Sequence, residues 1–228
     1  MESSHGRVGL VFVSHSPKIA EGLVDLARQM APNAVLVPAG GTDEGGIGTS
    51  FSKVADGIEQ ADSGVGVALL CDLGSAILTA ETALDFLDDE VRARVRIVDA
   101  PFVEGGVAAA VAAEIGGDLD AVEEAARSAL RAAPAAEAAP SAPPLATRTV
   151  TLINKDGLHA RPAADFVQLA STFEARVTVN GADASSLLAI MGLGLTRGKT
   201  AEISSSDAHG AEAVEALANL LESGFGEE

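Results

Sequence analysis

The stretch that decides the fold of the C-terminal part of the chain is GLHARPA, at residues 157–163. It places His159 directly ahead of a predicted helix, with Arg161 two residues later. Pro162 falls in the first turn, where its missing N–H would have no helical acceptor anyway. The first amides of a helix lack internal acceptors and its dipole is positive there, so the position favours an anion. Because neutral imidazole is also a nucleophile, the local chemistry predicts a phosphorylated histidine at His159.

The composition limits the function classes open to the chain. The 228 residues contain 15 Lys and Arg against 33 Asp and Glu, and the net charge of −18 disfavours nucleic acid and anionic membranes as partners. The sequence contains no apolar run of about 18 residues, so no membrane span is expected. The first residues do not resemble a signal peptide. The single cysteine, Cys71, excludes an internal disulfide and a cysteine-rich zinc site. We therefore expect a cytoplasmic protein with no metal or cofactor.

An alanine- and proline-rich segment divides the chain. Residues 132–146 read AAPAAEAAPSAPPLA, a composition typical of an extended, semi-rigid linker that would span about 45 Å at ~3.1 Å per residue. We therefore predict an N-terminal domain at residues 1–131 and a C-terminal domain at residues 147–228.

The N-terminal domain alternates apolar runs with helical patterns. Continuous apolar runs are typical of parallel strands covered on both faces, so the pattern predicts a three-layer α/β domain. The expected strands lie at residues 8–13, 34–37, 64–71 and 94–98, and the expected helices at 17–30, 50–60, 75–87, 104–115 and 118–131. A glycine-rich loop at residues 40–49 contains neither the Walker pattern nor Gly-x-Gly-x-x-Gly. It is a flexible surface loop or lines a site, with Thr49 capping a helix or contacting phosphate.

Two polar side chains follow strands of this domain. His15 comes after the first predicted strand and Asp72 after the third, and ligands of such sheets bind beyond the carboxyl ends of the strands. A carboxylate beside an imidazole holds one ring nitrogen as a donor and leaves the other as a nucleophile. The residues alone also allow a purely structural His15. Cys71 is interpreted as a small apolar residue rather than a reactive thiol.

Three segments of this domain carry a family resemblance. VFVSHSPKIAEGLVDLARQM (residues 11–30), LLCDLGSAILTAETALDFL (69–87) and APFVEGGVAAAV (100–111) resemble the mannose-type IIA domain. They are most similar to the phosphotransferase subunit of the phosphoenolpyruvate-dependent dihydroxyacetone kinase. The resemblance implies that His15 carries a phosphoryl group on Nε2 and that Asp72 is its acidic partner. It also implies a homodimer formed through the N-terminal domain.

The C-terminal domain has a different pattern, which predicts the order βαββαβα. Alternating polar and apolar residues indicate a half-exposed antiparallel sheet, with helices on one face as an open-faced α+β sandwich. Asn180-Gly181 predicts a hairpin turn, and Ser185 or Ser186 is expected to cap a short helix. The expected strands lie at residues 147–153, 175–179, 182–184 and 200–204, and the expected helices at 160–171, 187–192 and 208–221.

This order, together with GLHARPA and with SSLLAIMGLGL at residues 185–195, resembles the histidine-containing phosphocarrier protein HPr. The resemblance implies that His159 carries a phosphoryl group on Nδ1, with Arg161 as the arginine beside it. Ser186 matches a serine that some HPr proteins present to a regulatory kinase, although a helix N-cap explains it without regulation. His5 and His209 match no active position.

Together the two resemblances imply a phosphotransferase component. The phosphoryl group would pass from phosphoenolpyruvate through enzyme I to His159, then to His15, and finally to ADP on the L subunit of dihydroxyacetone kinase, which works with a K subunit. Enzyme I is expected to be a separate protein. Two alternatives stay open: a IIA–HPr component of a mannose-type sugar transporter, whose acceptor is a IIB protein, and a regulatory module whose phosphorylation state a partner reads.

Overall fold

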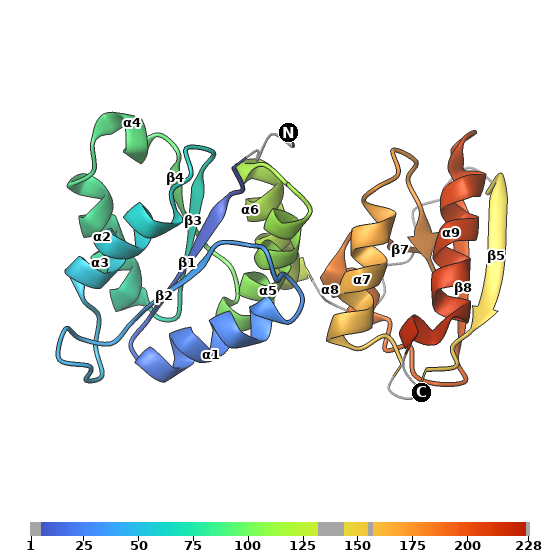
Figure 1. The fold of residues 1–228 in the computed structure, drawn as a ribbon, viewed down its shortest axis with the longest axis horizontal. Coiled ribbons are helices and arrows are strands. Elements are labelled where there is room, and N and C mark those ends of the chain that lie inside the picture. The colour runs from blue at the N-terminus through green and yellow to red at the C-terminus, as the bar shows by residue number, and fades with distance from the viewer. Residues whose placement is uncertain (1–5, 132–143, 155–156, 227–228) are drawn as a thin grey trace. The chain divides into compact units, whose positions relative to one another are not determined.

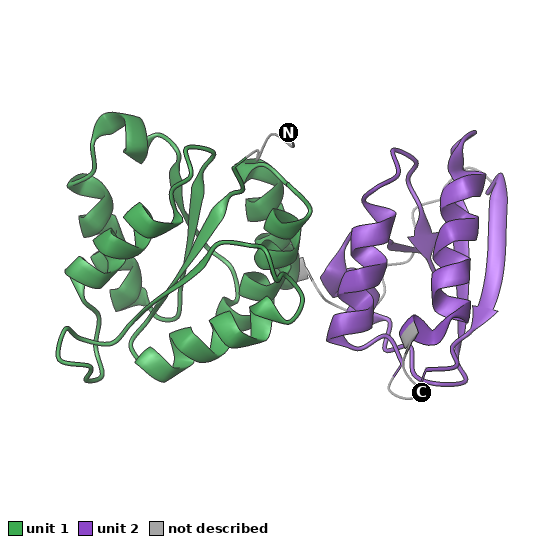
Figure 2. Cartoon of the chain, viewed as in Figure 1, with its two compact units in different colours: residues 1–131 green, residues 132–228 purple. Residues whose placement is uncertain are grey.

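The computed structural model describes residues 6–131, 144–154 and 157–226. The chain divides into two compact units, Met1–Arg131 and Ala132–Glu228 (Figure 2). Most of the predicted linker, residues 132–143, lies outside the described residues, and Ala146 already belongs to the first strand of the second unit.

The first unit is built on a parallel sheet with the strand order β2-β1-β3-β4. Because β1 and β3 are the inner strands and are covered on both faces, they consist of apolar residues, apart from Ser14 at the end of β1. Pro38 lies in β2, an edge strand, where the missing N–H of proline is tolerated. The strands are β1 (Gly9–Ser14), β2 (Leu36–Gly40), β3 (Val67–Cys71) and β4 (Val95–Val98).

Helices cover both faces of this sheet, which confirms the predicted three-layer α/β fold (Figure 1). One face is covered by α1, α5 and α6, and the other by α2 and α3. Side chains of β1 alternate between the two layers: Val11 and Val13 belong to the core under α2 and α3, while Phe12 contacts Phe102 of α5. The helices are α1 (Pro17–Arg28), α2 (Phe51–Ala61), α3 (Gly74–Asp85), the one-turn α4 (Asp89–Arg92), α5 (Phe102–Glu114) and α6 (Leu119–Ser128).

The second unit has the predicted order βαββαβα, followed by a 3₁₀ turn, and its antiparallel sheet has the strand order β5-β8-β6-β7. Asn180 and Gly181 have φ angles of 48° and 83°, as a two-residue hairpin turn requires. The strand expected at residues 175–179 has only two residues, because the N–H of Arg176 donates to the Asp207 carboxylate instead. The elements are β5 (Ala146–Thr151), α7 (Ala160–Ala170), β6 (Thr178–Val179), β7 (Ala182–Asp183), α8 (Leu187–Gly192), β8 (Thr200–Ser205) and α9 (Gly210–Glu222).

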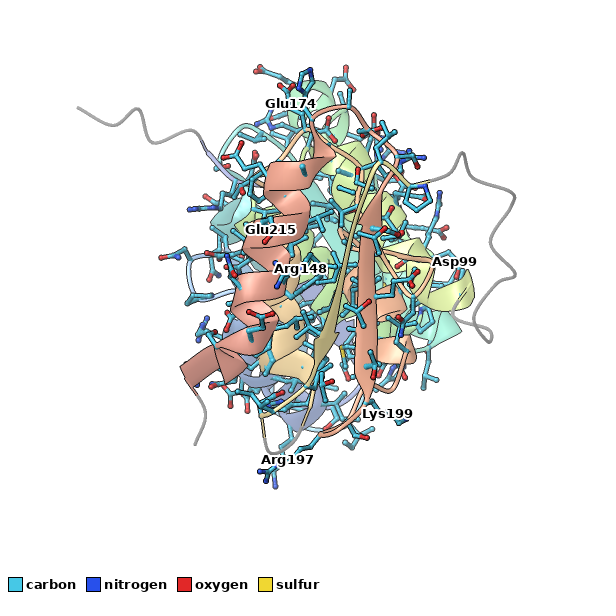
Figure 3. The ribbon with its side chains drawn as sticks, turned by 90° about the vertical axis from the view of Figure 1, so that its right-hand side faces the viewer. Asp99, Arg148, Glu174, Arg197, Lys199 and Glu215 are labelled. Carbon is cyan, nitrogen blue, oxygen red and sulfur yellow. The ribbon has the colours of Figure 1, made fainter. Side chains whose placement is uncertain are left out.

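Ion pairs connect the edge strand β5 to α9. Arg148 of β5 donates to the carboxylate of Glu215 and, over 2.8 Å, to that of Glu222. Figure 3 shows Arg148 and Glu215 facing each other between the strand and the helix. Arg148 and both glutamates are partly exposed, so this network contributes modestly to stability and mainly orients the strand and the helix.

Candidate functional site

His15 and Asp72 meet because of the register of two neighbouring strands. In the pairing of β1 with β3, Val13 lies opposite Cys71, so the segments that follow these two strands leave the sheet at the same edge. The N–H of Asp72 donates to the carbonyl of Val13 over 3.1 Å and closes this end of the ladder. The structure therefore brings together the two residues that the sequence analysis selected from separate strands.

One carboxylate fixes both the backbone and the ring of His15. Asp72 Oδ2 accepts from the Ser14 hydroxyl at 2.8 Å and from the His15 N–H at 2.9 Å. Asp72 Oδ1 lies 2.9 Å from His15 Nδ1. On the other side of the ring, His15 Nε2 lies 2.7 Å from the hydroxyl of Ser75. The imidazole is thus held at both nitrogens.

The charge of Asp72 decides which ring nitrogen of His15 is nucleophilic. Burial raises the pKa of the Asp72 carboxyl, but hydrogen bonds from the backbone and ring of His15 and from Ser14 outweigh burial and lower that pKa below its usual value. The ionised carboxylate only accepts hydrogen bonds, so Nδ1 of the neutral imidazole carries the proton. The lone pair then lies on Nε2, and the Ser75 hydroxyl donates to it.

The sequence analysis missed Ser75 as a contact of His15. Ser75 lies in the first turn of α3, three residues after Asp72, so an Asp-x-x-Ser spacing at a helix start was the available signal. The glycine-rich loop also reaches the site, because the N–H of Gly48 donates to the carbonyl of His15 over 2.9 Å. The expectation that Thr49 caps a helix is wrong: Ser50 caps α2, and the Thr49 hydroxyl bonds that of Thr79 at 2.7 Å.

Cys71 precedes Asp72 but is not a reactive group. Burial, together with the negative charges of Asp72 and Glu81, raises the pKa of the Cys71 thiol to about 12. The side chain stays a neutral thiol at physiological pH and lacks the nucleophilicity of a thiolate. This agrees with its interpretation as a small apolar residue rather than a reactive thiol, and the structure places the side chain in a partly buried position.

His159 stands at the start of α7 on a tight turn. It is the N-cap residue of the helix, and its carbonyl accepts from the N–H of Ala163 at 2.9 Å. The turn before it is anchored by the N–H of Leu158, which donates to the carbonyl of Leu195 over 2.8 Å. Asn154 donates from Nδ2 to the carbonyl of Gly157 at 2.6 Å. These hydrogen bonds hold the turn that carries His159, and the His159 side chain is exposed to solvent.

The first turn of α7 is suited to an anion. Arg161 is exposed in this turn, two residues after His159, and the proline at position 162 has no N–H to leave unsatisfied. The amides of residues 160 and 161 are helix-start donors for which the helix provides no acceptor. These donors and the guanidinium share one end of the helix with the imidazole.

Gly157 is required by its backbone and its neighbours. Its φ is +69°, and a Cβ there would lie 2.2 Å from the carbonyl oxygen of Leu195. We expect Gly157→Ala to lower the free energy of unfolding of the second unit by about 1–3 kcal/mol, measured by urea denaturation. Gly198→Ala is the matched control, because its φ is +82° but no atom lies within 4 Å of the added Cβ. Equal losses in both variants would show that the contact with Leu195 is unimportant.

The lowered pKa of Asp72 predicts a pH dependence of stability. Its stabilising contribution is complete above the ordinary value of 3.8 and is lost as the pH falls toward the lower value of the folded state. Between about pH 5 and about pH 2.5, wild type should therefore lose more unfolding free energy than Asp72→Asn, which has no carboxylate to protonate. Urea denaturation across this range measures the difference, and parallel curves for the two proteins would contradict the assignment.

Other predicted features have simple structural roles. Ser186 is the N-cap of α8 and accepts from the N–H of Ala189 at 3.4 Å, as the capping interpretation expected.

Among the residues that the structure describes, no group of three His, Cys, Asp or Glu side chains is placed to hold a metal ion. Within the same described ranges, no helix is both long and apolar enough to cross a bilayer.

Two family models match the chain, one in each unit. The model described as PTS system fructose IIA component matches residues 9–123. The model described as PTS HPr component phosphorylation site matches residues 146–223.

Individual relatives agree with both matches. The "PEP-dependent dihydroxyacetone kinase 2, phosphoryl donor subunit DhaM" of Listeria innocua is 44% identical over 105 residues, which cover 46% of this chain and 84% of that protein. The DhaM protein of Escherichia coli is 36% identical over 240 residues, and the match covers 96% of this chain. This chain spans 51% of the length of that relative.

A solved structure resembles part of the chain. The crystal structure of the protein of unknown function EF1359 has 34% sequence identity and a TM-score of 0.51, and it covers 54% of this chain and 95% of its own. The two family models and the matches to DhaM proteins show that this chain belongs to the DhaM family, with a phosphotransferase-system IIA domain joined here to an HPr domain.

Proposed function

We propose that the chain is a two-histidine phosphoryl carrier. His159 takes a phosphoryl group on Nδ1 from phospho-enzyme I, which is charged by phosphoenolpyruvate, and passes it to Nε2 of His15. From His15 the group goes to ADP bound on the L subunit of dihydroxyacetone kinase, which phosphorylates dihydroxyacetone with the K subunit. The relatives named as phosphoryl donor subunits of that kinase support the recipient. The chain is thus a phosphotransferase component rather than the complete kinase.

The geometry of His15 is the observation that carries this proposal. Asp72 holds Nδ1, so the nitrogen that faces the first turn of α3 is the nucleophilic one. A phosphoryl group on Nε2 would replace the hydrogen bond from Ser75 and lie beside the helix-start amides of α3, where an anion is stabilised. The same hydroxyl then becomes a donor to a phosphoryl oxygen.

The transfer between the two histidines balances without a further reactant. The lone pair of His15 Nε2 forms a bond to phosphorus as the bond from phosphorus to His159 Nδ1 breaks, and Nδ1 of His159 keeps that electron pair. The proton on Nδ1 of His15 stays between the ring and Asp72, whose negative charge stabilises the cationic ring that forms. Because both ends of the transfer are phosphoimidazoles, the step has little net free energy and is reversible.

The oligomeric state belongs to the same proposal. We propose a homodimer formed through the N-terminal unit, on the basis of the resemblance to mannose-type IIA domains. Sedimentation equilibrium of the whole chain should give twice the monomer mass of 22.9 kDa, and a single monomer mass at all concentrations would contradict it.

A reconstituted assay tests the relay and its recipient. The chain is mixed with enzyme I, labelled phosphoenolpyruvate, both kinase subunits and ADP, and dihydroxyacetone phosphate is measured. We expect product with wild type and none with His15→Ala or His159→Ala. A chain that is labelled on both histidines but yields no product would contradict the proposed recipient. Transfer to a IIB protein in the same mixture would then identify a sugar transporter component.

A further inference from the structure

The Ser75 hydroxyl lies 2.7 Å from His15 Nε2, yet the start of α3 offers little to hold it there. The N-cap residue of α3 is Leu73, whose side chain cannot accept a hydrogen bond, and the first helical residue is Gly74, the residue type with the greatest backbone freedom. Ser75 itself is exposed. Because helix ends of this kind fray, the restraint on Ser75 has to come from elsewhere in the fold.

Thr79, one turn after Ser75, makes a hydrogen bond to that first turn. Its hydroxyl donates to the carbonyl of Ser75 over 3.1 Å. The same oxygen lies 2.7 Å from the hydroxyl of Thr49 in the glycine-rich loop. Because a hydroxyl has one proton and Thr79 uses its proton on Ser75, Thr49 is the donor in this pair. The two threonines thus form a directed chain of hydrogen bonds from the loop to the turn that carries Ser75.

The glycine-rich loop holds Thr49 in a fixed place. The preceding residue, Gly48, donates from its N–H to the carbonyl of His15 over 2.9 Å, and the following residue, Ser50, caps α2. The φ of Gly48 is +145°, and a Cβ there would lie 2.8 Å from Cγ2 of Thr42, so the loop needs glycine at this position. Adjacent loop residues therefore bond to the backbone of His15 and to the helix that supplies its hydroxyl contact.

We propose that Thr49 and Thr79 are positioning residues for phosphoryl transfer at His15. Their hydrogen bond sets the distance between the first turn of α3 and the end of β1, and it keeps the Ser75 hydroxyl at Nε2. When Nε2 carries the phosphoryl group, the same hydroxyl is in place to donate to a phosphoryl oxygen. The proposal rests on the relay proposed above, and it adds two residues that act through Ser75 without touching the reacting atoms.

Loss of this hydrogen bond should affect the transfer rate more than the fold. Thr49 and Thr79 are both half-buried, whereas three alanines of α3 stay fully buried in the core under α2 and α3. Asp72 still holds Nδ1 of His15, so the lone pair stays on Nε2. The donor beside Nε2 is then the group that loses its place.

Single-turnover transfer from labelled His159 to His15 in the full chain tests the two threonines. We expect Thr79→Val, which keeps the shape of the side chain but removes the hydroxyl, to lower the transfer rate about tenfold. Thr79→Ser, which keeps a hydroxyl at this position, should transfer at close to the wild-type rate. Thr49→Val should also slow transfer. Adding Thr49→Val to Thr79→Val should slow it no further, because the two residues act through one bond.

The matched control is Thr82→Val on the same helix. Thr82 donates to the carbonyl of Leu78 over 2.7 Å, so it makes the same kind of bond within the helix as Thr79. Thr82 is exposed and lies three residues farther from the start of α3. We expect it to transfer at the wild-type rate. Equal slowing by Thr79→Val and Thr82→Val would overturn the proposal, since a general weakening of α3 would then explain both.

The ¹⁵N NMR signals of His15 test the positioning without any transfer. In chains that contain ¹⁵N-labelled histidine, at a pH where the imidazole is neutral, these signals are the ones absent from His15→Ala. We expect Thr79→Val to move the Nε2 signal downfield, because an imidazole nitrogen is less shielded when it no longer accepts a hydrogen bond. The Nδ1 signal should stay in place, because Asp72 still bonds that nitrogen. Movement of both signals would show a general disturbance of the site and would overturn the positioning role.

The outcomes separate the positioning role from the relay. A wild-type transfer rate for Thr79→Val, or an unmoved Nε2 signal, would overturn the positioning role and leave the relay intact. A wild-type chain that passes no label from His159 to His15 would overturn the relay, and with it the role of the two threonines in transfer.

Discussion

Replacing His159 with alanine should reduce labelling of the chain by enzyme I and phosphoenolpyruvate to background, a loss of about 10³-fold or more. The reason is that the relay is serial: His15 receives its phosphoryl group only through His159. No other residue of the second unit combines an exposed imidazole with a helix start, an arginine in the first turn and a rigid supporting turn among the residues described. Acid-labile label on the purified chain measures the effect.

Two further variants make this result interpretable. His15→Ala should keep the label on His159 and carry at most one phosphoryl group per chain. His209→Ala removes an exposed histidine at the start of α9 and should be labelled like wild type. Label on His15 in the His159→Ala chain would reveal an independent route from enzyme I to the first unit and would contradict the serial order.

Replacing Asp72 with asparagine should slow phosphoryl transfer through His15 by about 10²–10⁴-fold while leaving the charging of His159 unchanged. Three donors bond the Asp72 carboxylate. The Ser14 hydroxyl and the His15 N–H donate to Oδ2, and the ring Nδ1 of His15 donates to Oδ1. An amide has one acceptor oxygen, which best serves the two donors at the Oδ2 position. Its NH₂ group then faces Nδ1, moves the ring proton to Nε2 and removes the nucleophilic lone pair.

Single-turnover transfer from labelled His159 to His15 separates this effect from loss of charging. Asp85→Asn is a suitable control, because Asp85 is an exposed carboxylate of α3 that pairs only with Arg92 among the described residues. It should transfer at the wild-type rate. An Asp72→Asn chain that transfers equally fast would show that the orientation of the ring does not depend on this carboxylate.

Much of the fold could be predicted because its signals are local. The apolar runs of β1 and β3 mark strands covered on both faces, and Asn180-Gly181 marks a hairpin whose φ angles the structure confirms. The short α4 was missed because four residues with no buried side chain have no hydrophobic periodicity. The strand at residues 175–179 was overestimated because the Asp207 side chain, distant in sequence, takes the N–H of Arg176.

The sequence predicted that Asp72 lies beside His15, but it did not predict the other contacts of His15. The approach of Asp72 to His15 follows from parallel strand order, so the sequence pattern was sufficient. The Ser75 hydroxyl at Nε2 and the Gly48 amide on the carbonyl of His15 depend on how two loops fold over the strand ends. Loop conformation of this kind has no periodic signature in a sequence.

The pairing of Val13 with Cys71 at the end of the sheet has a consequence for protein engineering. The scaffold contributes two adjacent strand ends in register, and the residues that follow them, Ser14-His15 and Asp72-Leu73-Gly74-Ser75, supply the contacts of the ring. Any parallel sheet whose neighbouring strands end in the same register offers these two attachment points. Grafting the two short segments onto such a scaffold should transplant an imidazole of defined tautomer into an unrelated protein.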